Sequence, residues 1–178
     1  MACHDYHSFK HEDGFTLLEV MIAILVTSFA LLGLAGLQAT GLRFNHSSYL
    51  RTIAAQQAYD VTDRMRANIA AVTAGDYNNA TPVDTSNCLT VSGCSTSDMA
   101  KKDMFDWNAI TAARLPTGRG VVCIDSTPND GIYDSTTGTI TNNQCDGIGS
   151  LYAVKVWWID DTSKTPPLSS KFIMSFQP

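Results

Sequence analysis

An unbroken apolar segment near the N-terminus constrains this chain more than any other feature. Residues 15–37 contain one charged side chain, Glu19, and no charge follows it within the segment. A helix of roughly 20 apolar residues is long enough to cross the hydrocarbon core of a bilayer. The segment therefore predicts a membrane-spanning helix and argues against a soluble cytosolic enzyme.

Residues 1–14 are polar and end in Gly14, directly before the apolar segment. A secretory signal peptide has a basic start, an apolar stretch of about 7–15 residues and a small-residue cleavage site behind it. Here the apolar stretch is longer, and no such site follows it. Because no ordered scaffold surrounds the zinc-binding residue types in this segment, we interpret it as solvated and unstructured rather than as a metal site. These residues are Cys3, His4, His7 and His11.

A helical pattern continues beyond the apolar segment. No proline occurs before Pro82, and apolar side chains recur at steps of three and four, which is typical of an amphipathic helix. We predict one helix over residues 15–72, with its first half in lipid and its second half packed on the rest of the chain. Two acid–base pairs on its surface support it modestly, Asp60 with Arg64 and Asp63 with Arg66. The apolar stripe consists of Leu50, Ile53, Ala54, Val61, Met65, Ile69 and Val72.

Two residue types are unusual within the predicted helix. Glycine costs about 1 kcal/mol relative to alanine in a helix interior, and it occurs at Gly33, Gly36 and Gly41. These glycines fit either close packing of a neighbouring helix or a segment that loosens and stretches. Glu19 places a carboxylate in an apolar run, where a charge is costly and usually marks a functional site with a partner.

The residues around Glu19 form a known pattern. Residues 14–20 read Gly-Phe-Thr-Leu-Leu-Glu-Val and resemble the N-terminal signal of type IV prepilins and the related pseudopilins. The resemblance implies that a prepilin peptidase cuts after Gly14 and methylates the new amino group of Phe15. It also implies that Glu19 is the carboxylate used in assembly. The segment before the cut is acidic, whereas prepilin leaders are usually basic, so the orientation in the membrane rests on the resemblance.

Further segments resemble one group of minor pilins, the type IV pilus modification protein PilV family. They are residues 32–38, 63–68, 115–120 and 154–158. The resemblance implies a single-pass inner-membrane protein with its head in the periplasm, which later joins the pilus at the cell surface. The implied partners are the prepilin peptidase, the major pilin, other minor pilins, the inner-membrane assembly machinery and membrane lipid.

The remainder of the chain predicts a small head. Residues 75–97 are loop-like in composition, and Ser97 or Asp98 is expected to cap a short helix ending at Leu115. Residues 120–124, 151–159 and 171–177 have strand patterns. We expect these strands to form an antiparallel meander against the helix stripe, in an α+β lollipop. Its domains are a leader over residues 1–14, a membrane half over 15–37, and the amphipathic helix half with the head over 38–178.

Two tryptophans adjoin in the second predicted strand. Trp157 and Trp158 point to opposite faces, so we expect one in the core and the other more exposed. For the exposed residue we favour packing on the sheet under a loop over contact with another pilin.

Four cysteines remain after removal of the leader. On the oxidising side of an inner membrane they are expected to form two disulfides, for which three connectivities exist. We favour Cys88–Cys94 and Cys123–Cys145, because each pair closes a local polar loop. A zinc site built from all four is disfavoured, since paired C-x-x-C spacing is absent.

The predicted head contains no recognisable catalytic constellation. Asp125, Asn129, Asp130 and Asp134 are oxygen ligands of the kind that bind calcium. The EF-hand spacing and its distal glutamate are missing, so a hydrogen-bonded turn is favoured. No nucleophile elbow, P-loop or zinc-protease motif occurs, and His46 is the one histidine outside residues 1–14. We expect no enzymatic activity, no cofactor and no metal.

Composition and resemblance together leave three functional hypotheses. The net charge of −5 argues against a nucleic-acid binder, which would present a basic face. The leading hypothesis is a minor pilin that aids assembly of a type IV pilus and pilus-dependent motility or adhesion. The alternatives are a pseudopilin of a type II secretion system and a pilus-displayed adhesive binding module.

Overall fold

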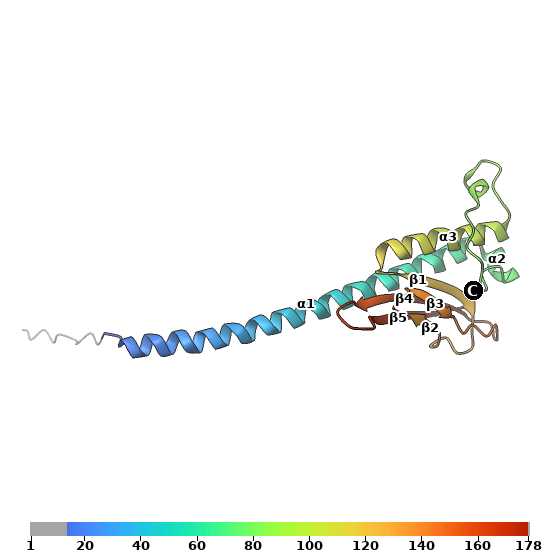
Figure 1. The fold of residues 1–178 in the computed structure, drawn as a ribbon. Helices are drawn as coiled ribbons and strands as arrows, with labels where there is room; N and C mark the ends of the chain where they lie inside the picture. The colour runs from blue at the N-terminus through green and yellow to red at the C-terminus, as the bar shows by residue number, and fades with distance from the viewer. Residues whose placement is uncertain (1–13, 178) are drawn as a thin grey trace, which may run out of the picture. The chain divides into compact units, whose positions relative to one another are not determined.

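The computed structural model describes residues 14–177 and divides the chain into two compact units, one ending at Asn45 and the other beginning at His46. The first unit contains the N-terminal part of α1, a helix that runs over Leu17–Ala67. The second contains the C-terminal part of α1 and all remaining elements (Figure 1). The suggested ligands Cys3, His4, His7 and His11 lie outside the described residues.

The predicted helix over residues 15–72 is confirmed in outline but is broken at Asn68. The backbone leaves the helix there, and a second helix, α2, follows over Ile69–Ala74. The Asn68 side chain donates to the backbone oxygen of Thr96, so the break is fixed by a contact across the head. Because of the break, Ile69 does not continue the apolar stripe; its side chain is 51% exposed, against our expectation. Gly75 ends α2 in the left-handed conformation that glycine adopts most readily.

The third helix begins earlier than predicted. A short 3₁₀ turn, η1, spans Ser86–Leu89, and α3 spans Thr96–Arg114. The N-cap is Ser95, not Ser97 or Asp98: the backbone N–H of Asp98 donates to the Ser95 hydroxyl at 3.1 Å. The helix ends before Leu115 and Pro116, as the sequence predicts.

The three predicted strands are present and antiparallel. They are β1 (Arg119–Ile124), β4 (Tyr152–Asp161) and β5 (Leu168–Phe176), in the order β1-β4-β5. Two short strands that the sequence does not predict, β2 (Ile132–Asp134) and β3 (Thr139–Asn142), form a separate hairpin between β1 and β4. The three predicted strands pair in chain order, so the antiparallel meander is confirmed, with the β2–β3 hairpin inserted between its first two strands.

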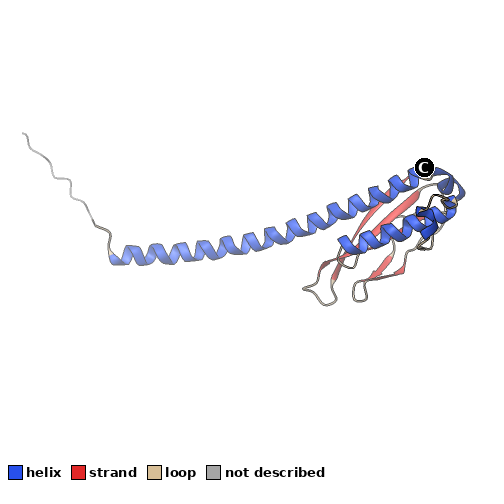
Figure 2. Cartoon of the chain, turned by 90° about the horizontal axis from the view of Figure 1, so that it is seen from above, coloured by secondary structure: helices blue, strands red, loops and turns tan. Residues whose placement is uncertain are grey.

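The core lies between the C-terminal part of α1, α3 and one face of the sheet, layers that Figure 2 shows from above. Leu50, Ala54, Val61 and Met65 of the predicted stripe are buried, and small Ala54 and Ala58 allow close approach. Trp107 of α3 is fully buried, and its indole N–H donates to the backbone oxygen of Gln57 at 2.8 Å. Burying each large apolar side chain contributes roughly 1.5–3 kcal/mol, so these contacts hold the helix on the sheet.

Both faces of β4 are buried. Tyr152, Val154, Val156 and Trp158 face the helices, as predicted. Trp157 lies on the other face and is also buried, so the expectation of one exposed tryptophan is wrong. A side chain at Gly131 would lie 2.6 Å from the Trp157 ring, which places the segment leading into β2 directly over it. The favoured interpretation, packing under a loop, is confirmed.

Candidate functional site

The signal residues lie at the start of α1. Gly14, Phe15 and Thr16 precede the helix, and among the described residues no heavy atom other than those of its neighbours lies within 4 Å of a Cβ built on Gly14. Phe15 is 83% exposed. The peptide bond after Gly14 is thus open to an enzyme, in a non-helical segment directly before a rigid helix.

Thr16 is a site residue that the sequence motif alone does not single out. The backbone N–H of Glu19 donates to the Thr16 hydroxyl at 3.2 Å, which caps the first turn of α1. A threonine followed three residues later by glutamate is the signature of a capping box, so this signal is present in the sequence. The cap fixes the start of the helix two residues after Phe15. It also places the Glu19 carboxylate in the first turn, where the helix dipole favours a negative charge.

Glu19 shares one side of α1 with small and apolar residues. Phe15, Ala23 and Thr27 line the same shallow hollow as Glu19. Ala23 and Thr27 follow at steps of four, so a neighbouring helix meets little steric obstruction beside the carboxylate. This face brings together the predicted cleavage, methylation and assembly positions, which the sequence already places close together.

Three hydroxyl side chains further along this helix are satisfied within it. The hydroxyls of Thr27, Ser28 and Thr40 each donate to the backbone oxygen four residues earlier. Hydroxyls bonded in this way are compatible with lipid, where an unsatisfied polar group costs several kcal/mol. By length and composition, α1 contains a segment able to cross a membrane.

Comparison with known families identifies the N-terminal segment. Residues 9–35 match the family described as the prokaryotic N-terminal methylation motif. The chain carries a prepilin-type methylation signal. In this signal and in its α+β fold the chain is similar to type IV pilins and pseudopilins, which are typically structural and not enzymatic. No curated protein and no solved structure matches the chain significantly.

The signal has direct consequences for processing and location. A methylation motif of this kind implies processing by the prepilin peptidase. Followed by the apolar part of α1, it indicates a membrane-anchored protein of the envelope or pilus.

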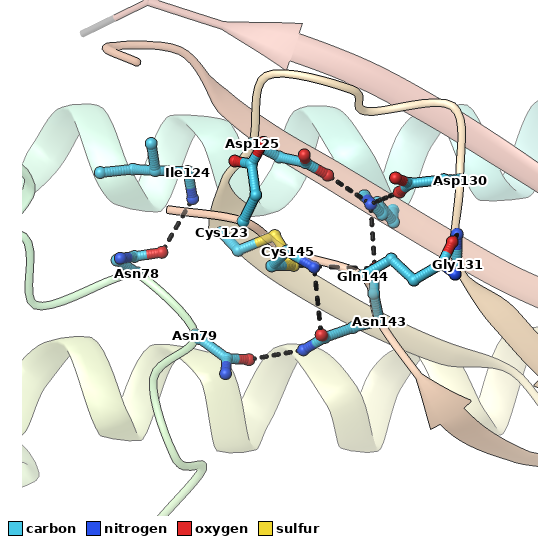
Figure 3. The surroundings of a disulfide bond; sticks show 12 residues. Asn78, Asn79, Cys123, Ile124, Asp125, Asp130, Gly131, Asn143, Gln144 and Cys145 are labelled. Carbon is cyan, nitrogen blue, oxygen red and sulfur yellow. Dashed lines mark hydrogen bonds and ion pairs between the residues drawn. A yellow bond between two sulfur atoms is a disulfide. The ribbon is translucent and has the colours of Figure 1, made fainter. Parts of the chain in front are cut away.

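In the head, two of the acidic residues considered and disfavoured as calcium ligands surround a lysine. The ammonium of Lys155 lies 2.5 Å from a carboxylate oxygen of Asp125 and 2.5 Å from one of Asp130. It also donates to the backbone oxygen of Asn143 at 3.0 Å. Figure 3 shows the two carboxylates pointing toward each other beside a disulfide. With a cation already between them, Asp125 and Asp130 do not form a calcium site.

The other two residues considered as ligands, Asp134 and Asn129, also have contacts within the head. The Asp134 carboxylate accepts from the backbone N–H and the hydroxyl of neighbouring threonines, which confirms the hydrogen-bonded turn. The backbone oxygen of Asn129 accepts from Lys171. Lys155 itself is absent from the sequence-based candidates, although a lysine in the middle of an apolar strand signals a buried charge that needs partners.

The Lys155 contact predicts a dependence of stability on pH. The hydrogen bond from Lys155 holds the pKa of Asp130 below its usual range. A carboxylate with a lowered folded-state pKa stabilises the fold fully above its unfolded pKa of about 4, and this stability is lost as pH falls through the folded value. We expect Asp130→Asn to be less stable than wild type at pH 7 and to lose less stability on acidification to pH 3. Urea unfolding at both pH values measures this; equal acid sensitivity of the two proteins would contradict it.

Both expected disulfides are present. Cys88 is bonded to Cys94 and Cys123 to Cys145. The cluster of Cys123, Asp125 and Cys145 has the composition of a metal site. However, its sulfurs are bonded to each other and its carboxylate faces Lys155, so it does not fit a metal.

The two disulfides are expected to contribute unequally to stability. In the loop-entropy account a bridge stabilises more when it closes a longer loop. The sequence separations of 6 and 22 residues correspond to about 2 and 3 kcal/mol respectively. We expect Cys123→Ala/Cys145→Ala to lower the urea midpoint more than Cys88→Ala/Cys94→Ala, and wild type to resist alkylation until reduced. Four freely reactive thiols in periplasmically expressed protein would show that the pairing is wrong.

Proposed function

We propose that this protein is a minor pilin of a type IV pilus that aids assembly or priming of the fibre and pilus-dependent motility or adhesion. The observation that carries the proposal is the methylation motif over residues 9–35, which includes the start of a membrane-length helix that continues into an α+β head. The PilV-like segments over residues 32–38, 63–68, 115–120 and 154–158 favour a minor pilin among the proteins that share this motif.

In this proposal the chain is divided by function. Residues 1–14 are the leader, residues 15–37 are the membrane and assembly half of the helix, and residues 38–178 are the rest of the helix and the periplasmic head. The prepilin peptidase cuts after Gly14, and the new amino group of Phe15 is methylated. The exposed, non-helical backbone before α1 supports the cleavage step.

Glu19 provides the assembly contact. Cleavage creates a positive amine at Phe15, and both this amine and the carboxylate are costly in hydrocarbon unless each meets a partner. Within one chain the two groups are about one helical turn apart, so they can pair before assembly. In the fibre the amine of a neighbouring subunit replaces that partner, and the pair then selects the axial register of the two helices.

The hypothesis is tested by deleting the gene and scoring surface pili, protein secretion and adhesion in the same strain. A minor pilin predicts fewer pili and lost twitching, with secretion intact, and restoration by the wild-type gene. Lost secretion with normal pili would instead identify a pseudopilin of a type II secretion system. Normal pilus number with lost adhesion would identify an adhesive module. Either result would overturn the assembly role.

A further inference from the structure

The two edge strands of the β1-β4-β5 sheet, β1 and β5, differ in the hydrogen bonding of their outer backbone groups. At β1, the backbone N–H of Ile124 donates to the Asn78 side chain at 2.8 Å (Figure 3). The backbone oxygen of Val122 accepts from the N–H of Asn79 at 2.9 Å. The N–H of Gly120 donates to the side chain of Asn108 at 3.2 Å. Three asparagines thus close this edge.

The opposite edge is open. β5 is nine residues long and has one neighbouring strand, β4. Within residues 14–177, no backbone hydrogen bond joins the outer edge of β5 to another segment. An edge strand of this length presents a row of free N–H and C=O groups, which an extended chain can pair with. The sheet therefore has one edge, at β1, that is capped by asparagines, and one edge, at β5, that can pair with another strand.

A cavity lies beside the open edge, on the face of the sheet away from the helices. It has a volume of about 330 Å³. Its wall includes Ile132, which is 52% exposed although it is a large apolar residue. When a strand is added to a sheet, backbone pairing supplies affinity and pockets for alternate side chains supply specificity. The lining includes Ile132 and Tyr133 of β2, Trp157 of β4, and Ser169, Ser170 and Lys171 of β5.

Side chains of β5 indicate what an added strand would carry. On the helix face, Phe172 and Met174 pack against the core but are only half-buried, so apolar side chains on a further strand would cover them. On the other face, the Lys171 ammonium donates to the backbone oxygen of Asn129 at 2.8 Å. A carboxylate opposite Lys171 would form a favourable cross-strand pair.

We propose that the open edge of β5 binds an extended segment of a different polypeptide, which joins the sheet as a fourth strand. The segment is apolar on the helix face and carries an acidic side chain on the Lys171 face. A second copy of this chain fits poorly. Antiparallel pairing of two β5 strands places two Lys171 side chains on one face of the joined sheet, where like charges repel. This surface is independent of the proposed pilus role.

The proposal is tested on the full chain in detergent micelles with a synthetic peptide as long as β5. The probe has valine at odd and threonine at even positions, with glutamate in place of threonine at position 6, which lies opposite Lys171 when the peptide pairs antiparallel along the whole of β5. The control peptide has lysine there instead. Amide hydrogen exchange is read residue by residue. At a saturating concentration of the glutamate peptide, we expect the β5 amides that point away from β4, which are every second amide, to exchange about tenfold more slowly than without peptide. The exchange rates of the β1 amides should not change.

Charge reversal provides the matched control. Wild type is expected to bind the glutamate peptide about fivefold more tightly than the lysine peptide, and Lys171→Glu is expected to reverse this order. Unchanged β4 amide exchange shows that the variant is folded. The proposal is overturned if saturating peptide leaves β5 exchange unchanged. It is also overturned if protection of β5 rises with protein concentration alone, since the occupant is then a second copy.

Discussion

Lys155→Met is expected to lower the free energy of unfolding of the head by about 3–5 kcal/mol, because removing one member of a buried ion pair leaves an uncompensated charge. Lys155 and its partner Asp125 are both fully buried, whereas Asp130 is partly exposed and can be solvated. The cost therefore arises mainly at Asp125. Urea unfolding followed by tryptophan fluorescence measures it, since all three tryptophans lie in the head.

Two further variants separate this mechanism from a general packing defect. Adding Asp125→Asn to Lys155→Met should recover part of the lost stability, because the buried charge is removed. Lys171→Met is the matched control: that lysine lies at an exposed contact with Asn129, so its loss should cost less than about 1 kcal/mol. If Lys155→Met were as stable as wild type, the ion cluster would not hold this part of the head.

Glu19→Gln is expected to leave cleavage and head folding intact while lowering the incorporation of the protein into pili. Glu19 lies more than 25 positions before the head unit, which begins at His46, so its loss leaves the head unchanged. A hydrogen bond to a charged group contributes about 1.5–3 kcal/mol, and every 1.4 kcal/mol is about a factor of ten. The amount in sheared pili, relative to the major pilin, should therefore fall about tenfold or more. The protein should accumulate in the inner membrane.

Thr27→Ala is the control for this experiment. Thr27 lies on the same side of the helix, but its hydroxyl is bonded within the helix, so incorporation should stay near wild type. Glu19→Gln protein in sheared pili at the wild-type ratio would show that the charge pair does not drive assembly. Reduced cleavage of the variant would instead assign Glu19 to recognition by the peptidase.

Structural features of this chain that depend on a short stretch of sequence can be predicted from that stretch alone. The alternation of Tyr152, Val154, Val156 and Trp158 identifies the core face of β4, and the polar loops between cysteines favour the pairs that are found. The start of α1 is also local: the spacing of Thr16 and Glu19 is a capping signal that can be read without a structure.

Features that depend on distant partners are not predictable in this way. The β2–β3 hairpin is short and polar, so it has no strand pattern, yet the segment leading into it covers the far face of β4 and buries Trp157 and Lys155. The break at Asn68 is similar, because an asparagine within a helical pattern is ordinary until Thr96 is seen to accept its side chain. The lysine between Asp125 and Asp130 is a third example, since it comes from a strand that begins after both carboxylates and lies 25 residues beyond Asp130.

The central claim is that this chain is a processed prepilin, and the intact mass of the protein isolated from membranes tests it most directly. Wild-type protein should lack residues 1–14, begin at Phe15 and carry one additional methyl group on its amine. Replacing Gly14 by a bulky residue should block this maturation, so that the full-length mass is recovered from the same membranes. Wild-type protein that retains residues 1–14 in cells with an active prepilin peptidase would contradict the account.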